Sequence, residues 1–196
     1  MRKTVIASAL FAASVLPSLA AAQTAAPADD YTITGNVSLI NDYRFRGITQ
    51  TMKKPALQGG FDFSHASGFY LGNWNSNVSE YAGFPGGNLE MDFYGGYKTT
   101  FGDFGLDVGA IYYYYPGSKI GGTGSTVDNK EIYIGGSWQF LSAKYYYSVG
   151  DYFSDKGDKN KGTDGTGYLD LAATYDLGGG WGVNGHVGHL SYKGRD

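Results

Sequence analysis

The chain has 196 residues, with 32 glycines, 18 tyrosines, 5 prolines and no cysteine. Without cysteine, disulfide bonds and thiol catalysis are excluded. Its 15 basic side chains against 18 acidic ones lack the positive excess expected of a nucleic-acid-binding protein. Abundant glycine and aromatic residues with little proline are typical of a strongly twisted or closed all-β protein.

The start of the chain predicts an exported protein. Arg2 and Lys3 precede an apolar run at Val5–Leu16, and a run of alanines then offers small residues for cleavage. This is the pattern of a signal peptide, which we predict over residues 1–22. The apolar run is shorter than the ~20 residues of a spanning helix, which argues against a retained membrane anchor. Residues 23–30 are predicted to be a flexible lead-in.

The segment Tyr31–Arg46, YTITGNVSLINDYRFR, alternates between apolar or aromatic residues and polar ones. A period of two predicts a strand, because successive side chains point to opposite faces of a sheet. The segment is longer than the ~5–6 residues of an ordinary strand and reaches the ~9–11 that cross a bilayer at a tilt. A long strand with one apolar and one polar face suits a wall between lipid and water.

Eight further strands are predicted at residues 56–64, 69–78, 88–100, 106–114, 130–140, 143–152, 167–177 and 181–192. Their connections alternate between tight turns at His65, Gly102, Leu141 and Gly178 and long loops at Thr49, Ser79, Pro116 and Phe153. Short turns at one rim and long loops at the other are typical of outer-membrane barrels, with the short turns on the periplasmic side.

Residues 31–196 are therefore predicted to form an all-β, up-and-down antiparallel transmembrane β-barrel. Nine strands are counted, whereas single-chain barrels of this kind have even strand numbers. The chain stops on the polar residues Lys193–Asp196 without a final apolar strand. We expect about 12 strands in the complete barrel, and we expect the C-terminal strands to be missing from this sequence.

Aromatic residues on the apolar faces are predicted to face lipid, several of them as a girdle near the tight turns. They are Tyr31, Phe61, Phe63, Phe101, Phe104, Trp138, Phe140, Tyr175 and Trp181. In a soluble barrel the same rings would fill the interior. The sequence leaves open which way the apolar face points.

Charged residues on the polar faces are predicted to line the lumen and set its selectivity. They are Asp42, Arg44, Arg46, Asp62, Glu90, Asp92, Lys98, Glu131, Lys144 and Asp170. In a barrel of about 12 strands, Glu131 and Asp170 would lie across from the two arginines, giving a transverse field that sorts small polar solutes. The alternative is a set of local ion pairs that neutralise one another and plug a narrow bore.

No catalytic, cofactor or metal site is predicted, and an enzyme is not expected. His65, His186 and His189 are not accompanied by a nucleophile motif. Gly121–Gly124 lacks the Lys-Ser/Thr pair of a phosphate-binding loop. Aspartates crowd the loop at residues 155–164 without the spacing of an EF-hand, so a solvated loop is favoured over a Ca²⁺ site.

Four segments resemble the TorF-type porin family of proteobacteria. They are NDYRFRGITQTMKKPALQGGFDFSHASGFYLGNWNSNV, LEMDFYGGYKTTFGDFGLDVGAIYYYYPG, SAKYYYSVGDYF and GYLDLAATYDL, of which FRGITQT and YYYYPG are the specific parts. The resemblance covers nearly the whole mature chain and implies an outer-membrane pore with no known substrate. Members of this family continue with further strands and end on an aromatic residue, which agrees with missing C-terminal strands.

The predicted function is an outer-membrane, porin-like channel for passive diffusion of small hydrophilic solutes, in contact with outer-membrane lipid and not with nucleic acid. One alternative is a non-conducting surface barrel that binds partners through its long loops. Another is a secreted soluble barrel that holds an apolar ligand. The sequence predicts neither the solute nor the oligomeric state.

Overall fold

The computed structural model describes residues 30–120, 124 and 126–195. A nine-stranded antiparallel sheet dominates it, and the strands lie in the sheet in the order in which they occur in the chain. These strands are β1 (Tyr31–Ile40), β4 (Ala56–His65), β5 (Phe69–Asn77), β6 (Leu89–Phe101), β7 (Phe104–Lys119), β8 (Thr126–Trp138), β9 (Leu141–Ser148), β10 (Gly167–Gly178) and β11 (Trp181–Ser191). The predicted signal peptide at residues 1–22 lies outside the described residues.

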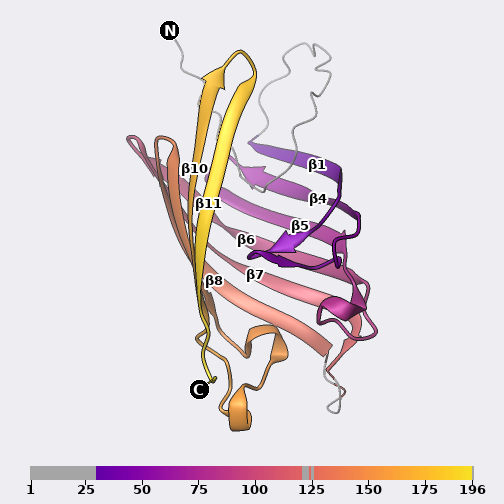
Figure 1. The fold of residues 1–196 in the computed structure, drawn as a ribbon. Helices are drawn as coiled ribbons and strands as arrows, with labels where there is room; N and C mark the ends of the chain where they lie inside the picture. Colours follow the sequence, from indigo (N-terminus) through magenta and orange to yellow (C-terminus); the bar gives the residue numbers. More distant parts are fainter. Residues whose placement is uncertain (1–29, 121–123, 125, 196) are drawn as a thin grey trace.

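The predicted all-β class and the antiparallel, up-and-down strand order are confirmed. The sheet is strongly curved (Figure 1). Over the described residues β1 and β11 are its two edges, so the sheet is not closed into a barrel. No helix in the described part of the chain is long and apolar enough to cross a membrane.

The connections alternate as predicted. Tight turns join β4 to β5, β6 to β7, β8 to β9 and β10 to β11. Glycines with positive φ, such as Gly68 at 103° and Gly180 at 84°, occupy three of them. The β8–β9 turn, predicted at Leu141, lies instead at Gln139 and Phe140, and Gln139 takes a φ of 52° there. The longer loops carry small elements: β2 (Arg44–Phe45), β3 (Ile48–Thr49), η1 (Glu80–Ala82), η2 (Tyr152–Ser154) and η3 (Asp158–Asn160). Short turns therefore connect the strands at one end of the sheet, and longer loops with small secondary-structure elements lie at the other end.

The first strand is shorter than predicted. β1 ends at Ile40, and the chain then turns back on itself in a hairpin in which Arg44 pairs with Thr49 and Phe45 with Ile48. Arg46 and Gly47 take positive φ values of 49° and 84° at the tip of this hairpin. The alternation continues through Arg46, but these left-handed residues end the extended conformation.

The fifth strand also differs from the prediction, which ends it at Tyr114 and gives Pro116 to a loop. β7 continues through Pro116 to Lys119, and Lys119 pairs with Thr126 of β8. The β7–β8 register shifts between Tyr114 and Lys119. Because proline has no N–H to donate, it is tolerated in a strand where the ladder is irregular in this way.

The two faces of the sheet differ sharply. We call the outer face the one that carries Ile33, Val37 and Leu39, which are 64, 76 and 71% exposed. The same face of the other strands exposes Leu57, Phe61, Leu71, Phe93, Ile132, Ile134, Leu171, Val183 and Val187. An apolar face of this extent is far larger than the isolated exposed apolar residues of a soluble monomer.

The inner face, on the opposite side, is lined by tyrosines, polar residues and glycines. Rings from neighbouring strands lie over the glycines: a Cβ at Gly72 would meet the ring of Tyr94, and one at Gly109 would meet the ring of Tyr133. The ring therefore lies flat against the strand instead of standing away from it. This arrangement requires glycine beneath each ring.

Candidate functional site

The loop end of the inner face is covered by residues 41–55, which we call the inner segment (Figure 1). Its Phe45 ring packs edge-on against Tyr113 of β7 and against Phe153, at centroid distances of 5.4 and 5.7 Å. Its Tyr43 ring meets Trp74 of β5 at 5.3 Å. These aromatic contacts hold the inner segment against the sheet.

The inner segment is tied to the sheet by an ion pair. Arg46 Nη1 and Nη2 donate to Glu131 Oε1 and Oε2 of β8 at 2.9 and 2.7 Å, and Arg46 Nη1 also donates to the Tyr152 hydroxyl at 3.0 Å. The side chains of Arg46 and Glu131 are only 6 and 1% exposed. Two parallel charge-assisted bonds fix both position and orientation of the guanidinium.

Four aromatic rings surround the same guanidinium. Its central carbon lies 4.3 Å from the ring centroid of Tyr168, 4.7 Å from Phe45, 5.2 Å from Tyr146 and 5.7 Å from Tyr152. All four distances are within the range of cation–π attraction. Burial lowers the pKa of Arg46, but its hydrogen bonds and charge interaction with Glu131 outweigh burial and raise the pKa above its ordinary value. Glu131 and the rings of Tyr146, Tyr152 and Tyr168 are called the Arg46 cage below.

Two more carboxylates are buried on the inner face near this site. Glu90 and Asp92, two residues apart on β6, are 0 and 4% exposed. Glu90 Oε1 accepts a hydrogen bond from the Tyr115 hydroxyl at 2.8 Å, while Glu90 Oε2 and Asp92 Oδ1 have no partner. Asp92 interacts electrostatically with both Glu90 and Glu131. The loop end of the inner face therefore holds three buried carboxylates and one buried guanidinium.

A second polar cluster lies midway along the strands, on the tight-turn side of the Arg46 cage. Lys144 Nζ of β9 donates to Asp107 Oδ2 of β7 at 2.6 Å, and the Tyr70 hydroxyl donates to Asp107 Oδ1 at the same distance. The Tyr70 and Tyr133 hydroxyls are 2.5 Å apart. Lys98 Nζ lies 4.3 Å from the Tyr70 ring centroid. Opposite charges on β7 and β9, the two neighbours of β8 in the sheet, thus neutralise one another here.

The remaining predicted lumen residues also have local partners. Asp62 Oδ1 accepts from the Tyr94 hydroxyl at 2.5 Å, and Asp170 Oδ1 lies 3.2 Å from His186 Nδ1. Asp42 and Arg44 stay together in the inner segment, with Asp42 Oδ2 2.8 Å from Arg44 Nε. The Thr49 hydroxyl and Arg44 lower the pKa of Asp42.

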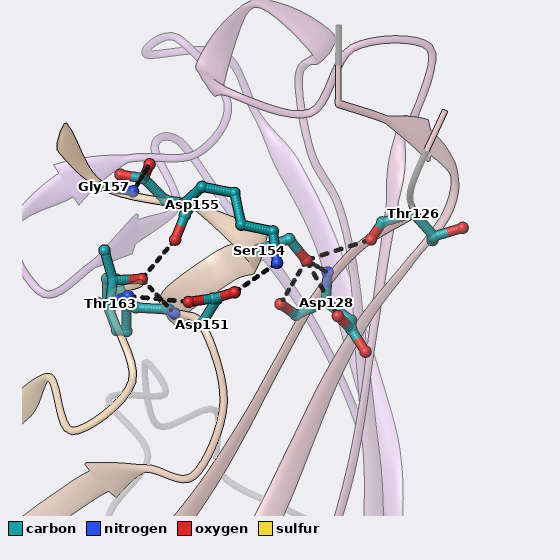
Figure 2. Close-up of polar contacts among 9 residues, drawn as sticks. Thr126, Asp128, Asp151, Ser154, Asp155, Gly157 and Thr163 are labelled. Carbon is teal, nitrogen blue, oxygen red and sulfur yellow. Dashed lines mark hydrogen bonds and ion pairs between the residues drawn. The ribbon is translucent and has the colours of Figure 1, made fainter. Parts of the chain in front are cut away.

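The loop between β9 and β10 folds back toward the sheet and brings Tyr152 and Phe153 to the inner face. Figure 2 shows the polar contacts that hold it. Ser154 Oγ accepts from Asp128 N at 3.1 Å, and Asp151 Oδ1 accepts from Thr163 N at 2.8 Å. Lys156 and the Thr163 amide lower the pKa of Asp151.

Asp155, one of the aspartates weighed as Ca²⁺ ligands in the loop at residues 155–164, is occupied by protein donors. Asp155 Oδ2 accepts from the Tyr192 hydroxyl and from Arg195 Nη2, both at 2.6 Å. Partial burial opposes these contacts, but they dominate and lower the pKa of Asp155 to about 2. Within the described ranges, no three His, Asp or Glu side chains are grouped closely enough to hold a metal ion.

The predicted lipid-facing residues lie on the outer face or at the turns that border it. Eight of them are exposed: Tyr31, Phe61, Phe101, Phe104, Trp138, Phe140, Tyr175 and Trp181. Phe63 is half-buried because its ring stacks on Tyr31 at a centroid distance of 5.9 Å. Phe104 stacks on Trp138, and Phe140 meets Tyr175 edge-on, so these rings form pairs beside the tight turns.

Several members of the site are missing from the predicted set. Asp107 lies on the inner face of β7, and the alternation around Leu106 and Val108 already indicates that face. Tyr70, Tyr133 and Tyr152 carry no such signal, because a tyrosine fits either face of a strand. Their role depends on neighbours up to 106 residues away in the chain.

The fold and this site define an all-β protein with a curved antiparallel sheet, an exposed apolar outer face and a polar, tyrosine-rich inner face closed at one end by a folded-in segment. A family model described as "bacterial protein of unknown function (Gcw_chp)" matches residues 24–195, and the chain belongs to this family. No curated protein and no solved structure matches the chain.

Proposed function

We propose that the sheet forms the wall of an outer-membrane β-barrel channel through which small hydrophilic solutes diffuse, as the resemblance to TorF-type porins implies. One observation carries this proposal: apolar side chains are exposed along the outer face of the sheet, while tyrosine, polar and charged side chains occupy the inner face. Lipid in contact with the outer face would remove that apolar surface from water, and the inner face would line the passage.

The side on which the apolar residues lie favours this proposal over a secreted barrel with an apolar ligand inside. The inner face carries Asp107, Lys144 and the buried pair of Arg46 with Glu131. An apolar ligand would leave such groups without water or further partners, which is costly.

A second candidate function is a non-conducting surface barrel that binds partners through its loops. It is favoured by the aromatic closure at the loop end, where Phe84 stacks on Tyr115 at 4.1 Å and Phe153 meets the same ring at 5.9 Å. This closure narrows the passage at the point where it would open to the outside.

Planar-bilayer conductance separates the two candidates. The protein in its full-length form, purified in detergent and added to one side of a bilayer, should give discrete current steps in KCl. Replacing Phe153 by Ala should raise the conductance, because this ring contacts Phe45, Tyr113 and Tyr115 across the inner face. Current no larger than that of the bare bilayer, for both proteins, would reject the channel and leave the surface barrel.

A further inference from the structure

The Arg46 cage has the composition of a binding site for a planar organic cation. It provides one carboxylate that accepts two parallel bonds from a guanidinium, and rings that flank the guanidinium at 4.3 to 5.7 Å. A carboxylate with several aromatic faces is the arrangement that recognises guanidinium and alkylammonium groups. In this structure the chain's own Arg46 fills the site.

The occupant is carried on an element that is separate from the wall. β2 and β3 pair with each other and not with the nine-stranded sheet. Arg46 lies at the tip of this hairpin with a φ of 49°, a conformation that non-glycine residues rarely adopt. The cage, by contrast, is built by β8, β9, β10 and the loop that follows β9. Glu131, Tyr146 and Tyr168 lie on strands of the sheet and therefore stay in place if the hairpin moves.

Carboxyl groups outnumber basic groups around the cage. Glu90 and Asp92 are buried on the same face, and Asp92 Oδ1 has no hydrogen-bond partner. The inner-face lysine nearest to the cage in strand register, Lys144, is already paired with Asp107 at 2.6 Å. Departure of Arg46 without a replacement would leave Glu131 buried and unpaired, which typically costs about 3–5 kcal/mol. Only another cation restores these contacts.

We propose that the Arg46 cage is a recognition site for organic cations of the guanidinium or alkylammonium type, and that Arg46 is a tethered occupant which such a cation displaces. The incoming cation makes the same bonds to Glu131 and the same ring contacts that Arg46 gives up, so it competes with the effective concentration of the tethered Arg46. The proposal names the solute class of the proposed channel, and its passage step depends on that function, whereas its binding step does not.

Binding is tested on the full chain in detergent with two probes of the same shape, methylguanidinium and its uncharged analogue methylurea. In an Arg46→Ser variant, which empties the cage, titration calorimetry should show methylguanidinium binding at least ~10-fold more tightly than methylurea. The wild-type protein should keep this preference with weaker binding, because Arg46 competes. Equal binding of the two probes in both proteins, or a preference confined to the variant, would overturn the proposal.

Matched variants assign the effect to the cage. Adding Glu131→Gln to Arg46→Ser should abolish the preference for methylguanidinium, whereas adding Glu80→Gln, at an exposed position in another loop, should leave it intact. Lys54→Ser removes an exposed charge from the inner segment and should bind like the wild type. If Arg46→Ser does not fold, Arg46→Lys retains the charge but loses the two parallel bonds, and it should bind methylguanidinium more tightly than the wild type.

Bilayer recordings separate this proposal from the channel itself. Methylguanidinium should reduce the Na⁺ current in a concentration-dependent way, at lower concentration in Arg46→Ser than in the wild type, and methylurea should have no effect. Selective binding in detergent without any current would remove the channel and retain the cation site. Current that methylguanidinium does not reduce would retain the channel and reject the claim that cations bound at the cage lie in its passage.

Discussion

The guanidinium of Arg46 and the carboxylate of Glu131 form two parallel hydrogen bonds of 2.9 and 2.7 Å across 85 residues of sequence. This pair joins the hairpin after the first strand to the middle of the sheet, in a place from which water is largely excluded. The pair therefore stabilises the fold and also holds the inner segment over the loop end of the inner face.

Removing one partner of this pair should destabilise the protein strongly. Arg46→Ala should lower the free energy of unfolding by about 3–5 kcal/mol, because Glu131 would stay buried without a counter-ion. The measurement is urea unfolding in detergent, since guanidinium salts would fill the cage. The double variant Arg46→Ala/Glu131→Gln should lose less than the sum of the two single variants. Lys54→Ala, at an exposed position in the same segment, should change stability by less than about 0.5 kcal/mol.

The tyrosine rings that lie over glycines predict that a side chain added at such a glycine lowers stability. A Cβ added at Gly96 would meet the Val108 carbonyl oxygen and the Tyr70 side chain. Gly96→Ala should therefore lower the unfolding free energy by about 1–3 kcal/mol. The matched control is Gly185→Ala on β11, where a Cβ would meet nothing within 4 Å. Equal stability of the two variants in thermal unfolding would contradict the flat packing of the ring on the strand.

A charged residue placed on the outer face should affect stability differently in lipid and in water. Val37 is 76% exposed, so Val37→Arg should be nearly neutral if water covers that face. If lipid covers it, an arginine near the bilayer midplane costs about 2–4 kcal/mol. Refolding into lipid vesicles and measuring stability distinguishes the two cases. Asn36→Arg, one residue earlier on the inner face, should stay close to the wild type, and a larger loss there than at Val37 would reject the proposed orientation.

Removing the Phe153 ring should loosen one loop and leave the sheet folded. Its ring meets Phe45, Tyr113, Tyr115 and Tyr152 at centroid distances from 4.7 to 5.9 Å. Phe153→Ala should release the loop between β9 and β10 without unfolding the sheet. Hydrogen exchange at residues 151–163 should accelerate at least ~10-fold while the amides of β6 and β7 stay protected. Tyr81→Ala removes an 80% exposed ring from another loop and should leave the exchange unchanged.

The contacts of Asp155 predict a loss of stability in acid. Its pKa is lowered from 3.8 to about 2 in the folded protein, so the unfolded chain takes up its proton first as the pH falls. The contribution of Asp155 is complete above about pH 4 and disappears as the pH falls toward 2. Thermal unfolding between pH 5 and pH 2 should show this decline, and Asp155→Asn should flatten it. An unchanged slope in that variant would show that other carboxylates carry the acid dependence.

The strands could be predicted because each one is long and faces two different environments. The period of two in segments such as LEMDFYGGY separates Leu89 and Met91 from Glu90 and Asp92, and the structure places the two carboxylates on the inner face. Three of the four tight turns were equally predictable, since glycine at positive φ marks them, whereas the β8–β9 turn lies at Gln139 and Phe140 instead of at Leu141. Closure of the sheet and the membrane location stay predictions.

The inner segment could not be predicted from local pattern. Residues 41–46 continue the alternation of β1, and nothing within them shows that Arg46 takes a left-handed conformation. Glu131, whose ion pair with Arg46 stabilises this conformation, lies on β8. Four other strands separate β8 from β1 in the sheet. A long-range pair of this kind is a property of the assembled fold. The same holds for the tyrosines, whose glycine counterparts lie on neighbouring strands.

The chain-order arrangement of the strands has a consequence for assembly. Each strand in the nine-stranded sheet pairs with the one that precedes it there, so the wall can be built hairpin by hairpin as the polypeptide emerges. Arg46, however, emerges long before its acceptor on β8. The hairpin that carries Arg46 can form this ion pair only after β8 has been added to the sheet. The packing of the inner segment over the inner face is therefore among the last parts of the molecule to form.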